Sequence, residues 1–316
     1  MRGALVTLQE HHRQPLPNLV IAGVAKAGTT SLFRYLSQHP DVCPSSVKEA
    51  RYFTGLRYGE SLPAPAEYAA LFSRCDGRRF RMEATPGYYP GGAVVARGIA
   101  ELLPDSRVVV LFRDPVQRCW SWYRFVRSTT RIPKDLSFPA YLDRCTELHR
   151  REVDHLREHQ PFWGLGGGCY DRWIDDWLDV FGERLRIGYF EDLVAHPQEF
   201  TEQLCGWLGA DTDVCAGFTY HVENRTVQYK NRGLQRAALS LNRGGERFFG
   251  RHPGLKRALR SSYYRVNADS GGERLDPASR ERLSAFYAPH NERLAARLAS
   301  AGRERMPTWL AAARRT

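Results

Sequence analysis

The sequence predicts an α/β fold, with a central parallel β-sheet flanked by helices, and three observations support this. Short buried strand patterns alternate with helical patterns along most of the chain. A glycine-containing loop at residues 23–28 joins the first strand to the first helix. Hydrophobic residues make up 42% of the 316 residues and charged residues 26%, as in a globular domain. No linker divides the chain, so we expect one domain over residues 18–316, preceded by a flexible tail at 1–17.

The strands are expected where short runs of β-branched and other apolar residues occur. These runs are Leu19–Gly23, Arg81–Ala84 before a Pro-Gly turn, Arg107–Phe112 and Leu185–Phe190. Continuous apolar runs of this length are typical of strands buried on both faces of a parallel sheet.

The helices are expected where apolar residues recur on one face and where start and stop residues bound the pattern. The segments are Thr29–Gln38, Pro115 to about Arg127, Phe138–Arg150, Glu152–Gln160, Tyr170–Phe181, Pro197–Leu208, and Arg280–Ala301 on both sides of Pro289. Asp114 is expected to cap the second of them. Residues 55–66, 128–137 and 222–275 are expected to be irregular, and Lys48–Phe53 a loop or a short helix.

The net charge of +11 is consistent with a nucleic acid, a membrane surface or an anionic substrate as partner. Only five of the 46 basic residues are lysine, so arginine is the usual cation of this chain. No nucleic-acid-binding module is visible, and we predict no nucleic-acid partner. The longest apolar runs are of strand length, which predicts no membrane span. Residues 1–17 contain no apolar signal segment, so a cytoplasmic location is expected.

The seven cysteines predict neither a zinc site nor a disulfide framework. Their number is odd, their spacing is irregular and no two form a CxxC pair. We expect buried free thiols and no bound metal.

The loop after the first strand has the features of a phosphate-binding loop. Gly23 and Gly28 have the spacing G-x-x-x-x-G, and the hydroxyl residues 29–31 follow at the start of a helix. Thr29 stands where an ATP-binding loop has its lysine, and the only lysine is Lys26, inside the loop. We therefore predict a phosphate site that differs from an ordinary ATP site; the alternative is a glycine-rich turn without a ligand.

A second anion site is predicted at the end of Arg107–Phe112. ATP- and GTP-dependent enzymes often have an aspartate for magnesium at such a strand end, but Arg113 follows here. A charge directly after a buried strand is costly unless it is paired, so Arg113 indicates a bound anion. We expect Ser121, further along the helix, to reach the same anion.

These residues resemble the sulfotransferases that use 3′-phosphoadenosine 5′-phosphosulfate (PAPS), and among them the heparan-sulfate type. The similar segments are Lys26–Leu32, Lys48–Phe53, Glu83–Tyr88, Arg113–Arg118 continuing to Ser121, Gly168–Tyr170, Tyr189–Leu193 and Lys230–Gly233. The resemblance covers roughly residues 18–235 and is weaker to about 300. It implies a P-loop-like, nucleotide-kinase-like fold and an enzyme that transfers a sulfuryl group from PAPS, leaving the bisphosphate PAP.

The resemblance also implies roles for individual residues. The residues expected to bind the donor are Lys26, Ala27, Gly28, Thr29, Thr30, Ser31, Arg113, Ser121, Tyr170, Lys230, Arg232 and Gly233. The catalytic residues implied are Glu49 as general base, Lys26, and Lys48 near the transferred group. For three of these residues a structural role is an equal alternative: core packing for Tyr170, and an ordinary surface loop for Arg232 and Gly233.

Ala84 departs from the pattern, because the heparan-sulfate enzymes have a lysine there. The membrane anchor of the Golgi enzymes is also not visible in the sequence. We therefore expect the acceptor to be a small molecule, a lipid or a carbohydrate rather than a glycosaminoglycan, modified at a hydroxyl or an amine. The sequence leaves the oligomeric state open.

Three other functions remain open. A P-loop kinase would hold Mg-ATP in the same loop, with Asp114 on the metal. A nucleic-acid-binding protein would use the basic residues of 225–265. A catalytically inactive scaffold would bind the nucleotide without turnover.

Overall fold

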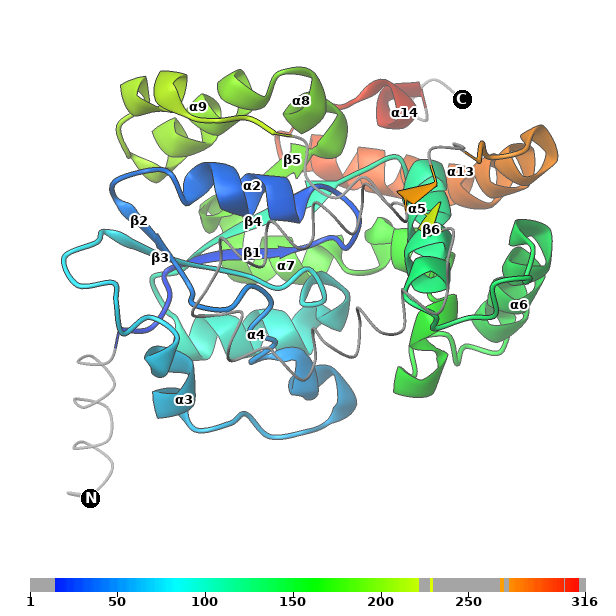
Figure 1. Cartoon of the computed structure of the whole chain (residues 1–316), viewed down its shortest axis with the longest axis horizontal. Coiled ribbons are helices and arrows are strands. Elements are labelled where there is room, and N and C mark those ends of the chain that lie inside the picture. Colours follow the sequence, from blue (N-terminus) through cyan, green and yellow to red (C-terminus); the bar gives the residue numbers. More distant parts are fainter. Residues whose placement is uncertain (1–14, 222–227, 230–267, 270–272, 304, 313–316) are drawn as a thin grey trace.

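The computed structural model describes residues 15–221, 228–229, 268–269, 273–303 and 305–312 (Figure 1). Five parallel strands of this part form one sheet in the order β2-β3-β1-β4-β5. The strands are β1 (Leu19–Gly23), β2 (Val42–Pro44), β3 (Phe80–Ala84), β4 (Arg107–Phe112) and β5 (Leu185–Tyr189). The predicted parallel sheet is confirmed, and its fold is the P-loop-like α/β fold.

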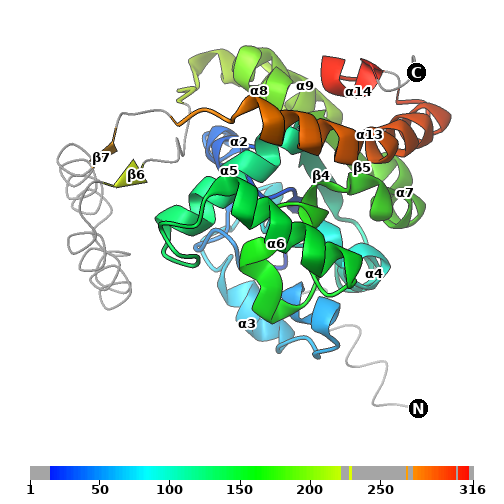
Figure 2. The same cartoon turned by 90° about the vertical axis from the view of Figure 1, so that its right-hand side faces the viewer.

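Helices cover both faces of the sheet (Figure 1). One side carries α2 (Thr29–Leu36), α8 (Phe190–Ala195) and α9 (Pro197–Leu208), and the other carries α4 (Gly92–Leu102) and α7 (Ile174–Phe181). The remaining α-helices are α3 (Pro65–Ala70), α5 (Pro115–Ser128), α6 (Phe138–Arg150), α13 (Pro277–Ser300) and α14 (Thr308–Ala311). Figure 2 shows α5, α6 and α13 gathered beyond one end of the sheet.

Short elements connect these layers. They are the 3₁₀ helices η1 (Thr54–Tyr58), η2 (Tyr89–Gly91), η3 (Arg157–Phe162), η4 (Gly166–Gly168), η5 (Tyr170–Arg172), η6 (Gly182–Arg184) and η7 (Asp213–Gly217), and the antiparallel pair β6 (Gln228–Tyr229) and β7 (Ala268–Asp269).

Two hydrophobic cores hold the fold together. The first surrounds the sheet: all five residues of β1 are buried, as the continuous apolar run predicts. The second lies between α5, α6 and α13, where Trp122, Tyr141 and Tyr287 are buried together. Pro289 lies inside α13, which continues on both sides of it as expected.

Several element predictions were wrong or incomplete. Glu152–Gln160 is not an α-helix, because Glu152 takes a left-handed φ of +56° and ends α6 there. The segment Tyr170–Phe181 is divided at Trp173, whose φ of −129° is not helical. Phe190 begins α8 instead of ending a strand. Strand β2 and helices α3, α4, α8 and α14 were not predicted, because each is short or lacks a marked stop signal.

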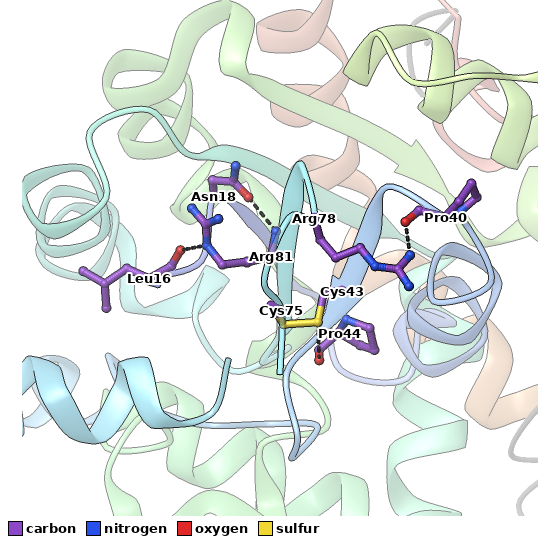
Figure 3. The surroundings of a disulfide bond; sticks show 8 residues. All are labelled: Leu16, Asn18, Pro40, Cys43, Pro44, Cys75, Arg78 and Arg81. Carbon is purple, nitrogen blue, oxygen red and sulfur yellow. Dashed lines mark hydrogen bonds between the residues drawn. A yellow bond between two sulfur atoms is a disulfide. The ribbon is translucent and has the colours of Figure 1, made fainter. Parts of the chain in front are cut away.

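The prediction of free thiols was wrong for one pair. Cys43 in β2 and Cys75, after α3, form a disulfide (Figure 3). The other five cysteines are free and buried: Cys119, Cys145, Cys169, Cys205 and Cys215. Sequence spacing does not reveal that pair, because 32 residues separate its members and Cys75 comes near Cys43 only where the chain approaches β3, the strand that pairs with β2. The packed chain also begins earlier than expected, since Leu16 is buried in the first core.

Candidate active site

The loop between β1 and α2 lies at the carboxyl end of the sheet. Lys26 has a φ of +73° and Gly28 a φ of +84°, both in the left-handed region. Gly28 precedes α2, and no side chain caps that helix. The first N–H groups of a helix have no partner within it and form its positive end, so an anion is stabilised there. Thr29 and Ser31 are buried at this end, and Thr30 is half-buried.

Helix α8 fixes the shape of this loop. A Cβ atom on Gly28 would lie 2.9 Å from Cδ2 of Leu193 and 3.0 Å from Cδ2 of Phe190, both on α8. Ala27, beside Gly28, is fully buried. Glycine is therefore required at position 28 for two reasons, its positive φ and the close approach of α8.

Lys26 lies in a strongly positive environment. Its Nζ lies 4.8 Å from the centre of the Phe125 ring. Burial, and after it three nearby guanidinium groups, lower the pKa of Lys26 to about 8. In order of their effect these groups belong to Arg113, Arg124 and Arg118. The positive charge around Lys26 thus adds to the free N–H groups of α2 as a second feature that attracts anions.

Arg113 is tied to the same loop. Its Nη1 donates a hydrogen bond to the carbonyl oxygen of Lys26 at 3.0 Å, and its guanidinium carbon lies 4.1 Å from the centre of the Phe190 ring. Burial lowers the pKa of Arg113, and the Glu191 carboxylate opposes this shift. Tyr170 donates from its hydroxyl to the Arg113 carbonyl oxygen at 2.8 Å. The Arg113 side chain, for which the sequence suggested no structural partner, therefore has two: the Lys26 carbonyl oxygen and the Phe190 ring.

Asp114 caps α5 as predicted. Its Oδ1 accepts a hydrogen bond from the Val116 backbone at 2.9 Å, and its own N–H donates to Oε1 of Glu191 at 3.0 Å. Burial raises the pKa of Asp114. Ser121 is half-buried further along α5.

The loop after β2 carries Lys48 and Glu49 and is pinned to the end of β3. The Glu49 N–H donates to the Ala84 carbonyl at 3.0 Å, and the Arg51 N–H donates to the Thr85 hydroxyl at 3.1 Å. Glu49 and Arg51 both have a positive φ, of +64° and +58°. Such backbone strain at non-glycine residues often marks functional sites, where the surrounding structure holds it in place.

Two cations hold the Glu49 carboxylate. Lys48 Nζ lies 3.4 Å from Oε1, and Arg51 Nη2 lies 3.1 Å from Oε2. The Glu49 side chain is 39% exposed, so solvent or an acceptor can reach it. The negative charge of Glu49 also acts on the pKa of Lys26, raising it. The structure therefore brings Lys26 and Glu49, two of the three predicted catalytic side chains, within electrostatic range of each other.

The structure places Tyr170 in the core. It is 1% exposed, and its ring stacks on Phe112 with 4.6 Å between the ring centres. Such contacts fit the alternative role in core packing. The Tyr170 hydroxyl also donates a hydrogen bond to the backbone of Arg113. Lys230, Arg232 and Gly233 lie outside the described residues.

Four charged residues near the site were not singled out from the sequence. Arg51 binds Glu49, Glu191 lies beside Arg113, and Glu83 lies fully buried below the loop of Lys48. Arg118 is 1% exposed and donates to the Gly164 carbonyl at 2.9 Å. All four lie in segments that resemble the family, so the resemblance was the signal that could have identified them.

Among the described residues, no group of three or more histidine, cysteine, aspartate or glutamate side chains is placed to hold a metal ion. In the same part of the chain, no helix is both long enough and apolar enough to span a bilayer.

Comparison with known proteins identifies similar chains. The sequence model of the Sulfotransferase family matches residues 68–213. Heparan sulfate glucosamine 3-O-sulfotransferase 3A1 of Mus musculus is 35% identical over 210 residues, covering 66% of this chain and 49% of that protein. The bifunctional heparan sulfate N-deacetylase/N-sulfotransferase of Drosophila melanogaster is 25% identical over 316 residues, covering 93% of this chain and 27% of that protein. The chain thus spans less than half of each relative.

A solved structure matches over nearly its whole length. The crystal structure of a sulfotransferase from Alicyclobacillus acidocaldarius has a TM-score of 0.62 and 26% sequence identity, covering 93% of this chain and 98% of that one.

The packing of α8 on Gly28 leads to a first prediction. Gly28→Ala places a Cβ against Leu193 and Phe190 at a positive φ, whereas Gly59→Ala meets nothing within 4 Å at a φ of +74°. The left-handed conformation alone costs an alanine about 1–2 kcal/mol. We expect Gly59→Ala to lose about this much stability in urea unfolding, and Gly28→Ala to lose at least about 1 kcal/mol more. Equal losses in the two variants would show that α8 does not press on the loop.

Proposed function

Because the chain belongs to the sulfotransferase family, we propose that it transfers the sulfuryl group of PAPS to an acceptor hydroxyl or amine. One observation carries this proposal: two anion-attracting elements lie side by side at the carboxyl ends of the neighbouring strands β1 and β4. The donor has two phosphate groups on one nucleoside, one of them bearing the sulfuryl group.

The 5′-phosphosulfate is assigned to the loop before α2. Lys26, the N–H groups at the start of α2 and the hydroxyls of residues 29–31 would donate to it. The 3′-phosphate is assigned to Arg113, whose planar guanidinium can bind a phosphate through two hydrogen bonds. Ser121 would donate to the same phosphate. Lys230, Arg232 and Gly233 stay predicted donor contacts.

The transfer is an in-line displacement at sulfur. An acceptor lone pair forms the new bond to sulfur, and the bond from sulfur to the phosphate oxygen breaks. That oxygen keeps the electron pair, so negative charge grows on the leaving PAP. Lys26 lies where such charge would be stabilised, and a preorganised cation does this without reorganisation during the reaction.

Glu49 is the proposed general base that takes the acceptor proton. Its carboxylate is 39% exposed, so an acceptor can reach it, and Lys48 and Arg51 fix its orientation. The acceptor is proposed to be a small molecule, a lipid or a carbohydrate. The relatives at 35% and 25% identity are named for heparan sulfate. Those names describe those proteins and do not identify the acceptor of this chain.

The alternative is a kinase that uses Mg-ATP. Its magnesium ligand would be Asp114, but the Asp114 carboxylate caps α5. The cytoplasmic location also stays a prediction. The Cys43–Cys75 disulfide weighs against it, because disulfides persist mainly in oxidising compartments.

Thermal unfolding with 3′,5′-adenosine bisphosphate tests the donor. Both phosphates of this product match the two proposed sites, so we expect about 2.7 kcal/mol of stabilisation at a ligand concentration of 100 times Kd. 5′-AMP and Mg-ATP are the controls and should stabilise much less. Stabilisation by Mg-ATP alone would replace the sulfotransferase proposal with the kinase.

The pKa of Lys26 predicts how PAP affinity depends on pH. Below about pH 8 the ammonium is charged in the free protein; above it, Lys26 must take up a proton before it can pair with phosphate. Affinity should therefore fall as pH rises above 8, by up to about tenfold per unit. Calorimetric titration from pH 7 to 9.5 measures this. Lys26→Arg does not titrate and should bind PAP equally over this range, and equal slopes in the two proteins would exclude Lys26 as the group.

Glu49→Gln tests the base. The amide cannot take a proton, so transfer should slow by about 10²–10⁴-fold, while PAP affinity stays at the wild-type value. PAP release from PAPS is measured for both proteins with the same panel of acceptors. Turnover near the wild-type rate would remove Glu49 from this role.

A further inference from the structure

Two cysteine side chains meet in the first core, between α9 and η7. Cys205 lies in the last turn of α9, and Cys215 lies in η7. Their Sγ atoms are 3.6 Å apart, and the Cys215 thiol donates to the sulfur of Cys205. Both residues are fully buried and in the reduced form. The sulfurs of a disulfide are about 2.05 Å apart, so a modest approach of the two side chains would join them.

The backbone around the two cysteines is fixed by hydrogen bonds. Gly209 ends α9 with a φ of +69°, and the Ala210 N–H donates to the Cys205 carbonyl at 2.9 Å. The Cys215 carbonyl accepts from the hydroxyl of Tyr220 at 2.9 Å. The chain therefore reverses direction directly after α9, and this reversal returns η7 to the helix with sulfur against sulfur.

Residues 209–221, which we call the strap, also connect α9 to α2 on the same side of the sheet (Figure 1). The Asp211 carbonyl oxygen lies 2.9 Å from Nε2 of His39. The Gln38 side chain accepts from the Thr219 N–H at 2.8 Å and donates to the Thr219 carbonyl at 3.2 Å. The strap is thus held at the carboxyl end of α2, the helix whose first turn we assign to the donor.

The chain already contains one disulfide, Cys43–Cys75. Disulfides persist mainly in oxidising surroundings, and an oxidant that maintains one pair is available to a second. In the folded protein, burial raises the pKa of the Cys205 and Cys215 thiols, so few reactive thiolates form there. Oxidation therefore belongs to the folding chain or to a local opening of the strap, and burial afterwards shields the bond from reductants.

We propose that Cys205 and Cys215 form a second disulfide, which fastens the strap to α9. The oxidant is another disulfide, such as oxidised glutathione. One cysteine thiolate attacks it and displaces a thiolate, and the second cysteine thiolate then attacks the mixed disulfide and displaces the other. The two cysteines lose two protons and two electrons, and the oxidant becomes two thiols. This inference does not depend on the proposed sulfuryl transfer.

Counting thiols in the full chain tests the proposal. The protein is held in a glutathione redox buffer, with urea just below the unfolding transition so that buried thiols open, until the count is constant. It is then denatured and alkylated. With both disulfides, three of the seven cysteines react, whereas five react if Cys43–Cys75 alone is present. We expect three, and five at every glutathione ratio would overturn the proposal.

Peptide mapping without reduction identifies the partners. Asp211 and Asp213 lie between the two cysteines, so digestion at aspartate separates Cys205 from Cys215 unless a disulfide joins the two peptides. We expect this linked pair of peptides. A second disulfide between any other cysteines would contradict the pairing.

Single alanine variants provide the controls. Cys205→Ala and Cys215→Ala each remove one partner, so we expect four reactive thiols under the same oxidising conditions, and either variant suffices if the other does not fold. Cys145→Ala removes a buried thiol that donates to the Phe162 carbonyl, and it should keep both disulfides. A second disulfide that persists in Cys215→Ala would refute the assignment.

The effect on the strap is measured in Cys43→Ala/Cys75→Ala, where a reductant acts on the proposed disulfide alone. A cross-link that closes this short loop restricts the unfolded chain, so the oxidised form should melt about 4 °C higher. Hydrogen exchange of residues 209–221 should slow on oxidation, while that of α6 should not change. Equal melting and equal exchange would show that no such link fastens the strap. If this variant does not fold, oxidised wild type and Cys215→Ala are compared instead.

Discussion

The positive charge buried around Lys26 is the constraint on which the rest of the site depends. An ammonium and several guanidinium groups gather at the ends of β1 and β4, and their mutual repulsion together with burial lowers the pKa of Lys26. The fold tolerates this because neighbouring groups fix each cation: a backbone carbonyl and the Phe190 ring for Arg113, and a glycine carbonyl for Arg118. A bound anion would relieve this repulsion. The cations of the free protein are therefore already arranged to attract an anion.

The strand, loop and helix to which the donor is assigned could be predicted from the sequence. Strand, glycine loop and helix follow one another within about twenty residues, so the loop around Lys26 is a local pattern. Arg113 was found for the same reason, because it directly follows a buried strand. The roles given to these residues remain proposals. The parallel sheet followed from the alternation of strands and helices, although β2 and the helices α3, α4, α8 and α14 were not predicted.

The remaining features depend on contacts between distant segments. Nothing near Glu83 in the sequence shows that Tyr68 will meet it, and the left-handed φ of Glu49 follows from the bonds of its loop to Ala84 and Thr85. The disulfide was missed because its cysteines are 32 residues apart and meet only once β3 has paired with β2. The place of Tyr170 likewise depends on a distant segment, because its ring packs against Phe112 of β4.

The order of the strands has a consequence for how such a protein diversifies. The elements assigned to the donor follow β1 and β4 in the middle of the sheet, whereas the loop of Lys48 and Glu49 follows β2 at its margin. A loop at the edge of a sheet can change in length or composition without breaking hydrogen bonds between the central strands. On the proposed function, residues around the loop at the edge can vary with the acceptor, while the central elements assigned to the donor and the position of Glu49 stay the same.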